Sequence, residues 1–292
     1  MYKYPYLEMK RVFEIRLSFI KALLIVPFAL FLNSCGDSGG GGLNIYSAAD
    51  DVKLGKQIDD QFKLDANKAK YPMYPNPAAT LYLQNIVDEL AKSKSLNYAN
   101  VFKYTIQIVN DPKTVNAFAT AGGYVYVYTG LLRYCENKAE LASVISHEMA
   151  HNDRRHSTQR MTKEYGIGVL ASVILGDNPE QWKAMLANIT KNLGILKNSR
   201  DDEFEADKYA YLYLKDTKYY PAGMQFFFNR ILASEKSGNR PSELEMLFAT
   251  HPYSQDRIDR VIKYANDDKI PAPTEQTIMK DEYSQFKLKF NF

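Results

Sequence analysis

The pattern of apolar and polar positions predicts two helices at the start of the folded part of the chain. From residue 48 to residue 64, apolar side chains recur among charged ones at the three- and four-residue spacing of an amphipathic helix. A proline-rich turn at residues 72–77 separates this segment from a second helical pattern, which runs from Leu81 to Leu90. The chain is therefore expected to enter its domain through helices.

The period of the pattern changes to two in the next segment. Apolar residues alternate over 102–109, and residues 115–120 and 124–129 have the character of two more strands. Helical patterns then return, over residues 137–162, 165–175, 180–196, 200–215, 221–235 and 255–265. A small sheet with helices before and after it predicts one mostly helical α+β domain over residues 48–266.

The last residues, 267–292, form a C-terminal extension whose structure the pattern leaves open. Pro271 and Pro273 precede a run in which Phe286, Leu288 and Phe290 alternate with lysines. This alternation fits an added strand, and the same residues fit a loose tail.

The first 34 residues have the composition of a bacterial targeting segment. Basic residues extend to Lys21, and Ala22 to Leu32 is uncharged and apolar, interrupted only by Pro27. This run has the length of a signal-peptide core and is too short to span a bilayer as a stable helix. It is followed by Ser34 and Cys35, and a small residue before a cysteine at this place resembles the bacterial lipobox.

The lipobox resemblance implies that residues 1–34 are a cleaved lipoprotein signal peptide and that Cys35 carries the lipid anchor. Residues 35–47, with the glycine run Gly39 to Gly42, would then be a flexible linker. An ordinary signal peptide with an incidental cysteine, or an uncleaved anchor, are the alternatives. Gly36 carries no retention charge, so the resemblance favours the bacterial outer membrane, facing the periplasm; the cell surface and the inner membrane stay open.

Charge and cysteine content argue against two classes of protein. Residues 1–34 carry five Lys or Arg and two Glu, a net charge of 5 − 2 = +3; the whole chain is also +3, so the remainder is 3 − 3 = 0. A neutral protein has no global field that attracts nucleic acid. With Cys35 lipidated, Cys135 has no partner for a disulfide and is expected to be a small buried apolar residue.

The run His147-Glu148-Met149-Ala150-His151 lies in a strongly helical stretch and suggests metal chemistry. On a helix, residues four apart lie about 40° apart in projection, so both imidazoles point to one side and suit a tetrahedral zinc ion. Glu148 lies on the same flank, where it can accept a proton from water.

The same stretch contains a third histidine, His156. If the helix runs unbroken to Arg160, a residue nine positions after His147 lies on roughly the opposite face. His156 is therefore expected at the surface and is not counted as a ligand.

A third protein ligand has to come from another segment, because a catalytic zinc keeps three protein ligands and water. The candidate is the acidic helix start from Ser199 to Asp207, where Glu203 and Asp207 share one face. One of these carboxylates can bind zinc while the other accepts the free N–H of a ligand imidazole. Glu205 should point away into solvent. The alternative is an exposed helix N-terminus whose acidic residues are favoured by the helix dipole.

Four motifs in order resemble the HtpX, BepA and Oma metallopeptidases, over about residues 52–264. They are Asn116-Ala117-Phe118-Ala119 with the Gly122 to Leu132 run, His147 to His151, the Ser199 to Asp207 segment, and Ala249-Thr250-His251-Pro252. The resemblance implies a zincin-like fold with an edge strand bordering the active site. BepA-type members add a helical repeat domain, so this chain is expected to be the stand-alone lipoprotein form. Integral-membrane members carry transmembrane helices, whereas the comparable run here, Ile167 to Leu175, is too short to span.

The resemblance implies zinc ligands and a base. Zinc, one ion per chain, would be held by His147, His151 and Glu203, and Glu148 would be the general base. Asp207 would accept a hydrogen bond from a ligand imidazole.

The resemblance also implies roles near the substrate. Asn116 and Ala117 would bind substrate backbone as an added strand. His251 would lie near the metal, either as a latch in the fourth position or as a group that stabilises the oxyanion. The alternative for His251 is a helix-capping or surface histidine.

These observations predict a zinc-dependent endopeptidase of the gluzincin type that hydrolyses misfolded or misassembled envelope proteins. Its partners would be protein or peptide substrates, the membrane through the lipid anchor, and outer-membrane assembly machinery, with no nucleic acid. The alternatives are a latched or weakly active chaperone-like assembly factor for outer-membrane proteins, and a structural zinc protein with four side-chain ligands. The intact Glu148 favours the enzyme, because a binding protein needs no general base.

Overall fold

The computed structural model describes residues 44–166, 179–192, 197–236, 241–252 and 254–292. The expected signal peptide, the lipidation site Cys35 and the apolar run Ile167 to Leu175 lie outside these ranges. Asn44 and Tyr46, which were expected in the flexible linker, are buried, and Asn44 Nδ2 donates a hydrogen bond of 2.9 Å to Thr158 Oγ1. The packed domain therefore includes residues before Ala48, which corrects the expected boundary.

Three strands form a small mixed sheet in the order β1–β3–β2. Strand β1 (Thr105–Val109) runs parallel to β3 (Tyr124–Tyr128), and β2 (Ala117–Thr120) runs antiparallel to β3. The strands match the predicted ones and are somewhat shorter at their ends. Strand β2 lies at an edge of the sheet and contacts helix α6 (Lys138–Asp153), which carries the metal motif.

The hairpin between β2 and β3 passes through a tight 3₁₀ turn, Ala121–Gly123. Gly122 has φ of 75°, and a Cβ atom there would lie 2.6 Å from the carbonyl oxygen of Asp51 and 2.7 Å from Val52 Cα in helix α2 (Ala48–Phe62). Neither this backbone conformation nor this space accepts a side chain. Glycine thus allows α2 to pack directly on the turn of the sheet.

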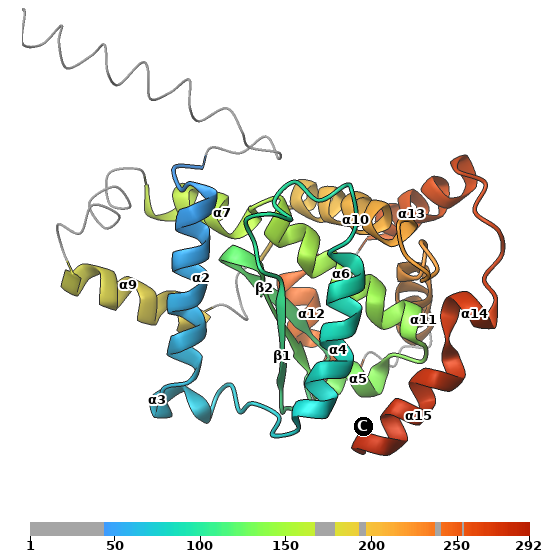
Figure 1. The fold of residues 1–292 in the computed structure, drawn as a ribbon, viewed down its shortest axis with the longest axis horizontal. Helices are drawn as coiled ribbons and strands as arrows, with labels where there is room; N and C mark the ends of the chain where they lie inside the picture. Colours follow the sequence, from blue (N-terminus) through green and yellow to red (C-terminus); the bar gives the residue numbers. More distant parts are fainter. Residues whose placement is uncertain (1–43, 167–178, 193–196, 237–240, 253) are drawn as a thin grey trace, which may run out of the picture.

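Helices make up most of the remaining described structure and surround α6, which is buried along its whole length. Figure 1 shows α6 crossing the centre, with α2 and α9 (Pro179–Asn192) on one side and α11 (Met224–Lys236), α14 (Glu275–Ile278) and α15 (Lys280–Phe290) on the other. The other helices are α3 (Asp65–Lys68), α4 (Pro77–Leu90), α5 (Thr129–Tyr134), α7 (His156–Tyr165), α10 (Arg200–Lys215), α12 (Glu245–Thr250) and α13 (Gln255–Asp267), with a 3₁₀ turn at Ser242–Leu244. The fold is the mostly helical α+β domain that the pattern predicted. Within the described ranges, no helix is both long enough and apolar enough to cross a membrane.

The predicted helix over residues 137–162 is wrong in one respect, because the chain forms two helices there. Helix α6 ends at Asp153, and Arg155 has a left-handed backbone with φ of 61° before α7 begins at His156. The Arg155 guanidinium forms a buried ion pair of 2.7 Å with Asp51 of α2 and donates to the carbonyl oxygen of Tyr46. This tertiary contact holds the turn at a point where the local pattern alone would continue the helix.

The C-terminal extension is neither a strand nor a loose tail. Residues Lys280–Phe290 form helix α15, and Tyr283, Phe286 and Phe290 are buried at the three- and four-residue spacing of one helix face. Leu288, which the alternating pattern grouped with the two phenylalanines, is 83% exposed. The helical spacing becomes apparent only when Tyr283 is counted with the two phenylalanines. Its hydroxyl donates a hydrogen bond of 2.7 Å to the carbonyl oxygen of Leu132.

Candidate metal centre

Helix α6 places the motif residues in the interior of the domain. His147 and His151 are each 3% exposed and Glu148 is 2% exposed. The Nε2 atoms of the two imidazoles lie 3.0 Å apart. The four-residue spacing therefore brings both rings to one side of the helix, as the sequence predicted.

Helix α10 brings the carboxylate of Glu203 to the same point. The two helices pack closely, and Ser146 Oγ of α6 donates a hydrogen bond of 3.0 Å to the carbonyl oxygen of Ala210 in α10. The carboxylate oxygens of Glu203 lie 3.4 Å from His147 Nε2 and 3.3 Å from His151 Nε2. The acidic start of α10 is therefore not an exposed helix terminus at this residue, because Glu203 is 1% exposed.

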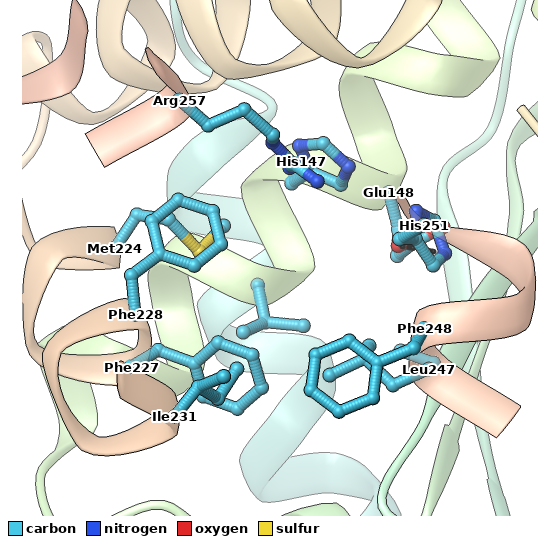
Figure 2. Close-up of a pocket in the computed structure, with 12 residues that line it drawn as sticks. His147, Glu148, Met224, Phe227, Phe228, Ile231, Leu247, Phe248, His251 and Arg257 are labelled. Atoms are coloured by element: carbon cyan, nitrogen blue, oxygen red, sulfur yellow. Dashed lines mark ion pairs between the residues drawn. The ribbon is translucent and has the colours of Figure 1, made fainter. Parts of the chain in front are cut away.

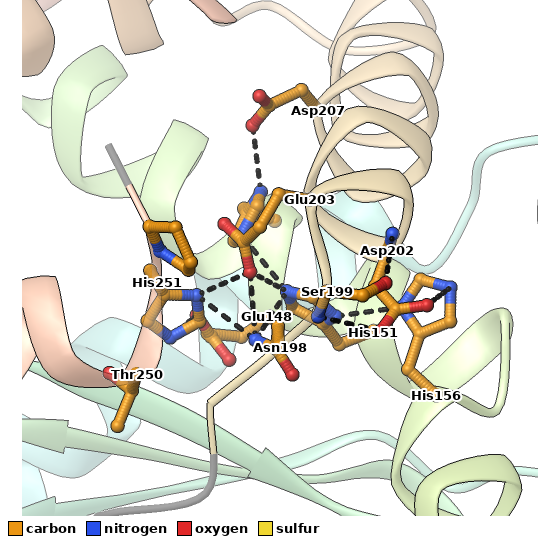
Figure 3. A network of polar contacts seen from close by, with 12 residues as sticks. Glu148, His151, His156, Asn198, Ser199, Asp202, Glu203, Asp207, Thr250 and His251 are labelled. Atoms are coloured by element: carbon orange, nitrogen blue, oxygen red, sulfur yellow. Dashed lines mark hydrogen bonds and ion pairs between the residues drawn. The ribbon is translucent and has the colours of Figure 1, made fainter. Parts of the chain in front are cut away.

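His251 completes the cluster from the end of α12. Its backbone occupies the C-cap position of that helix, but its ring is buried and points to the metal-motif residues (Figure 3). His251 Nδ1 lies 3.0 Å from Glu203 Oε1, and His251 Nε2 lies 3.5 Å from Glu148 Oε1. Asn198, which the sequence analysis did not consider, donates a hydrogen bond of 2.8 Å from Nδ2 to Glu203 Oε1. The alternative of a surface histidine at this position is excluded, because His251 is 7% exposed.

The donor atoms of this cluster fit a zinc ion. One ligand atom from each of His147, His151, Glu203 and His251 lies within 4.8 Å of all the others. Ligands bound to tetrahedral zinc at 2.0–2.1 Å are separated from one another by about 3.3 Å. The separations between the two Nε2 atoms and the Glu203 oxygens, from 3.0 to 3.4 Å, are close to this value. Two imidazoles and a carboxylate are also a ligand set of catalytic zinc sites.

A buried ion pair supports the His147 side of the cluster. Asp207 Oδ1 lies 3.0 Å from His147 Nδ1, so one carboxylate approaches the atom of the ring that faces away from the cluster. Arg257 of α13 binds Asp207 through two hydrogen bonds of 2.7 Å, and its Nη1 lies 2.5 Å from Glu203 Oε2. No role was expected for Arg257 from the sequence. Charge balance was the available signal, because two buried carboxylates require a nearby cation.

These charges separate the pKa values of the two imidazoles. Burial lowers the pKa of His147, but the carboxylates of Glu203 and Asp207 outweigh it and raise that pKa to about 9. Burial dominates at His151 and holds its pKa well below 6.5. At Glu203 burial raises the pKa, yet Arg257 and the neighbouring imidazoles bring it well below its usual range. The Glu203 carboxylate is thus charged and ready to bind a cation.

The other imidazole is supported by a residue that the sequence analysis placed at the surface. His156 is 2% exposed, and its Nδ1 lies 2.8 Å from Nδ1 of His151. His156 Nε2 lies 3.1 Å from Glu205 Oε2, and Arg154 Nε donates to Glu205 Oε1 over 2.8 Å. Glu205 is therefore not simply solvated, although its side chain is 25% exposed. The expectation for His156 failed because it assumed that the helix continues past Asp153. The expectation for Glu205 failed because His156 and Arg154 pair with its carboxylate.

Comparison with known proteins bears on what this cluster does. Residues 77–265, which include all four residues of the cluster, match Peptidase family M48. The chain belongs to this family. The resemblance drawn from the four sequence motifs is thereby confirmed.

Several curated relatives of the M48 chain are proteases. It is 28% identical to the beta-barrel assembly-enhancing protease of Yersinia pestis, over 86% of this chain and 50% of that protein. It is 26% identical to mitochondrial metalloendopeptidase OMA1 of Schizosaccharomyces pombe, over 67% of this chain and 56% of that protein. It is 29% identical to metalloprotease LoiP of Escherichia coli (strain K12), over 83% of this chain and 95% of that protein. The chain thus spans about half the length of the assembly-enhancing proteases it matches.

An apolar pocket lies directly beside His147, Glu148 and His251 (Figure 2). Phe227 and Phe228 of α11 line one side, Leu247 and Phe248 of α12 line the other, and Glu148 stands at its rim. The remaining lining residues are Ala117, Val144, His147, Met224, Ile231, His251 and Arg257. Apolar walls with a few polar groups at one end are typical of a pocket for an apolar group.

The edge strand borders this pocket. Ala117 is the first residue of β2 and lines the pocket together with Glu148. Asn116 precedes it and is fully buried, and its carbonyl oxygen accepts a hydrogen bond of 3.0 Å from the Tyr128 amide. Among the described residues, no hydrogen-bond partner meets either polar atom of the Asn116 side chain. A buried amide without a hydrogen-bond partner is uncommon in folded proteins.

Proposed function

We propose that the protein is a zinc-dependent endopeptidase of the bacterial envelope. The observation that carries the proposal is the convergence of His147, His151 and Glu203 beside Glu148, an acid with no place among the three ligands. Membership of a peptidase family and the protease names of the relatives support the same activity. Zinc is the metal proposed because two imidazoles and a carboxylate suit it.

The chemistry follows from the positions of the side chains. His147, His151 and Glu203 would hold the zinc ion, which would supply a Lewis acid that makes water more acidic and polarises a carbonyl group. Glu148, next to His147 in sequence, accepts the proton of the attacking water and returns it to the leaving amine. His251 Nε2 lies 3.5 Å from Glu148 Oε1, so this ring faces the reaction and can donate to the developing oxyanion.

The pocket and the edge strand suggest the substrate class. The backbone of an extended peptide would add to β2 next to Asn116 and Ala117, as strands do at a free sheet edge. A side chain flanking the scissile bond would then enter the pocket of Phe227, Phe228 and Phe248, which favours apolar residues. Unfolded or misassembled proteins expose such segments, which supports a role in quality control.

The location in the envelope is part of the same proposal. Residues 1–34 would be the signal peptide, Cys35 the lipid anchor and the outer membrane its destination, with the catalytic domain ending at residue 266 and an extension at 267–292. The beta-barrel assembly-enhancing protease among the relatives supports outer-membrane assembly machinery as a partner. Palmitate labelling in cells tests the anchor, because Cys35→Ser should abolish it.

Replacing Glu148 by Gln tests the activity. This change keeps the size of the side chain but removes the base, so cleavage of casein should fall by about 10²- to 10⁴-fold while one zinc per chain is retained. Glu180→Gln on α9 is a matched control, because this glutamate side chain is 82% exposed, and it should cleave normally. A chelator should stop cleavage by the wild-type protein. Undiminished proteolysis by Glu148→Gln would refute the assignment.

A latched, chaperone-like assembly factor is the second candidate. The observation in its favour is that one ring nitrogen of His251 lies within 4.8 Å of the other ligand atoms, so four side chains can close a tetrahedron. His251→Ala separates the two roles. Faster casein cleavage in this variant would indicate a latch, and slower cleavage with unchanged zinc content would indicate an oxyanion donor.

A further inference from the structure

The atom of His151 that faces away from the metal cluster meets an unusual partner. Ligand imidazoles in metal sites commonly donate this N–H to a carboxylate, a carbonyl oxygen or water, and His147 follows this rule with Asp207. His151 Nδ1 instead lies 2.8 Å from Nδ1 of His156, another imidazole. Both rings are nearly completely buried.

The direction of each hydrogen bond in the series His151–His156–Glu205 can be deduced. His151 directs Nε2 toward the metal cluster, so its proton is on Nδ1 and His156 Nδ1 must accept it. His156 then carries its own proton on Nε2, which lies 3.1 Å from Glu205 Oε2, an atom that can accept. Arg154 donates to the other oxygen of Glu205 and fixes the carboxylate (Figure 3 shows His156 beside His151). Every donor therefore has an acceptor.

The position of His156 depends on the break between two helices. Arg155 has a left-handed backbone and is held by Asp51 of α2, 2.7 Å away. Without this turn, a continuous helix would carry His156 to the far side of α6, away from His151. The strained left-handed backbone of Arg155 thus places the His156 ring behind the ligand His151.

We infer that His156 is a positioning residue that fixes the tautomer and ring orientation of the metal ligand His151, with Glu205 and Arg154 holding it in turn. The inference rests on the proposed metal site, but not on peptide hydrolysis. In the zinc-loaded protein, His156 makes no bond to the ion and acts only through His151.

Two amide substitutions distinguish the two ring nitrogens of His156. In His156→Asn the side-chain oxygen lies close to where Nδ1 was, so it can still accept from His151. In His156→Gln the amide lies close to where Nε2 was and reaches Glu205 but not His151. His156→Ala removes both contacts, and Ser157→Ala on the same helix controls for disturbance of α7.

The measurement is the zinc dissociation constant of the purified protein, by competition with a chromogenic chelator. His156→Ala and His156→Gln should bind zinc about 10- to 100-fold more weakly. His156→Asn should recover most of this loss, and Ser157→Ala should match the wild-type protein. Wild-type affinity in His156→Ala would overturn the inference, and so would equal losses in the Asn and Gln variants.

Two further readouts separate this role from a general structural one. The metal-free variants are compared by thermal unfolding. If His156 were merely structural, the variants would rank in the same order by melting temperature as by zinc affinity. Visible spectra of the cobalt-substituted proteins report the ligand field, which should change in the Gln variant and not in the Asn variant. If wild-type protein binds zinc without cleaving casein, the proposed function fails while this inference stands.

Discussion

The two imidazoles of the metal motif lie one helical turn apart on α6, yet they are supported in different ways. Behind His147 lies the carboxylate of Asp207, which is 3% exposed. Behind His151 lies the ring of His156, and beyond it Glu205, whose side chain is 25% exposed. The support of His147 is a buried charged group, whereas the support of His151 is a second imidazole followed by a carboxylate that solvent can reach.

The difference has two physical consequences. A carboxylate at hydrogen-bond distance stabilises a protonated ring, so metal-free His147 holds a proton that His151 lacks. The buried carboxylate of Asp207 also needs a buried cation, which Arg257 provides. The partly exposed carboxylate of Glu205 can be solvated by water instead. Two chemically identical ligands thus differ in charge and in their dependence on neighbouring ion pairs.

The largest effect is expected from removing the buried cation. Arg257→Met leaves the carboxylates of Asp207 and Glu203 buried together without a partner, so the free energy of unfolding should fall by about 3–5 kcal/mol. Arg154→Met on the other side leaves only Glu205, which water can reach, and should cost about 1 kcal/mol. Urea unfolding of the metal-free proteins at pH 7 measures both. Similar losses in the two variants would show that the two supports are not different in kind.

The second effect is a proton released when zinc binds. Below pH 9 metal-free His147 is protonated, and zinc requires the neutral ring, so affinity should rise with pH and level off near pH 9. The rise between pH 6.5 and 8.5 should be about 100-fold, because one displaced proton changes affinity tenfold per pH unit. His151 contributes nothing to this slope, since its pKa lies well below 6.5.

Calorimetry in buffers of different ionisation enthalpy measures the released protons directly. At pH 7 the wild-type protein should release about one proton through His147. Asp207→Asn should shift the levelling point to lower pH, because one of the two carboxylates that raise the His147 pKa has lost its charge. A slope that is unchanged in Asp207→Asn would contradict the assignment of the proton to His147.

The elements that could be predicted from the sequence are those set by local geometry. Residues four apart on a helix share a side, so His147 and His151 could be expected to converge without knowledge of the fold. Strand β1 followed from the alternation of apolar residues over 102–109. The acidic helix start from Ser199 to Asp207 offered two carboxylates on one face. The family resemblance then implied that Glu203 is the ligand. Its approach to within 3.4 Å of both rings agrees with that choice.

The supports of the cluster could not be predicted, because tertiary contacts determine them. One left-handed residue, Arg155, moves His156 from the far face to the back of His151, and it is held by Asp51 from a helix about a hundred residues earlier. No helical periodicity reports such a contact. Arg257 likewise becomes visible only when α13 is packed against α10.

A third and smaller effect concerns the carboxylate behind His147. Asp207→Asn keeps an oxygen that can accept from His147 Nδ1 but removes its charge, so zinc affinity should fall about tenfold. Chelator competition at pH 9 measures this loss with the proton effect largely removed. Asn should leave Arg257 bound to Glu203 and the protein folded, which circular dichroism verifies. Unchanged affinity would mean that the charge at this position does not act on the metal.

The smallest effect is expected at the open end of the other support. Glu205→Gln keeps an oxygen that can accept from His156 Nε2, and its side chain lies where water can replace the lost charge. Zinc affinity should fall by about threefold or less, and stability by less than about 1 kcal/mol, as for other partly exposed ion pairs. The same competition assay measures it beside Asp207→Asn. A loss as large as that of Asp207→Asn would show that the two supports do not differ. The charge of Glu205 would then act through His156 as strongly as the charge of Asp207 acts on His147 directly.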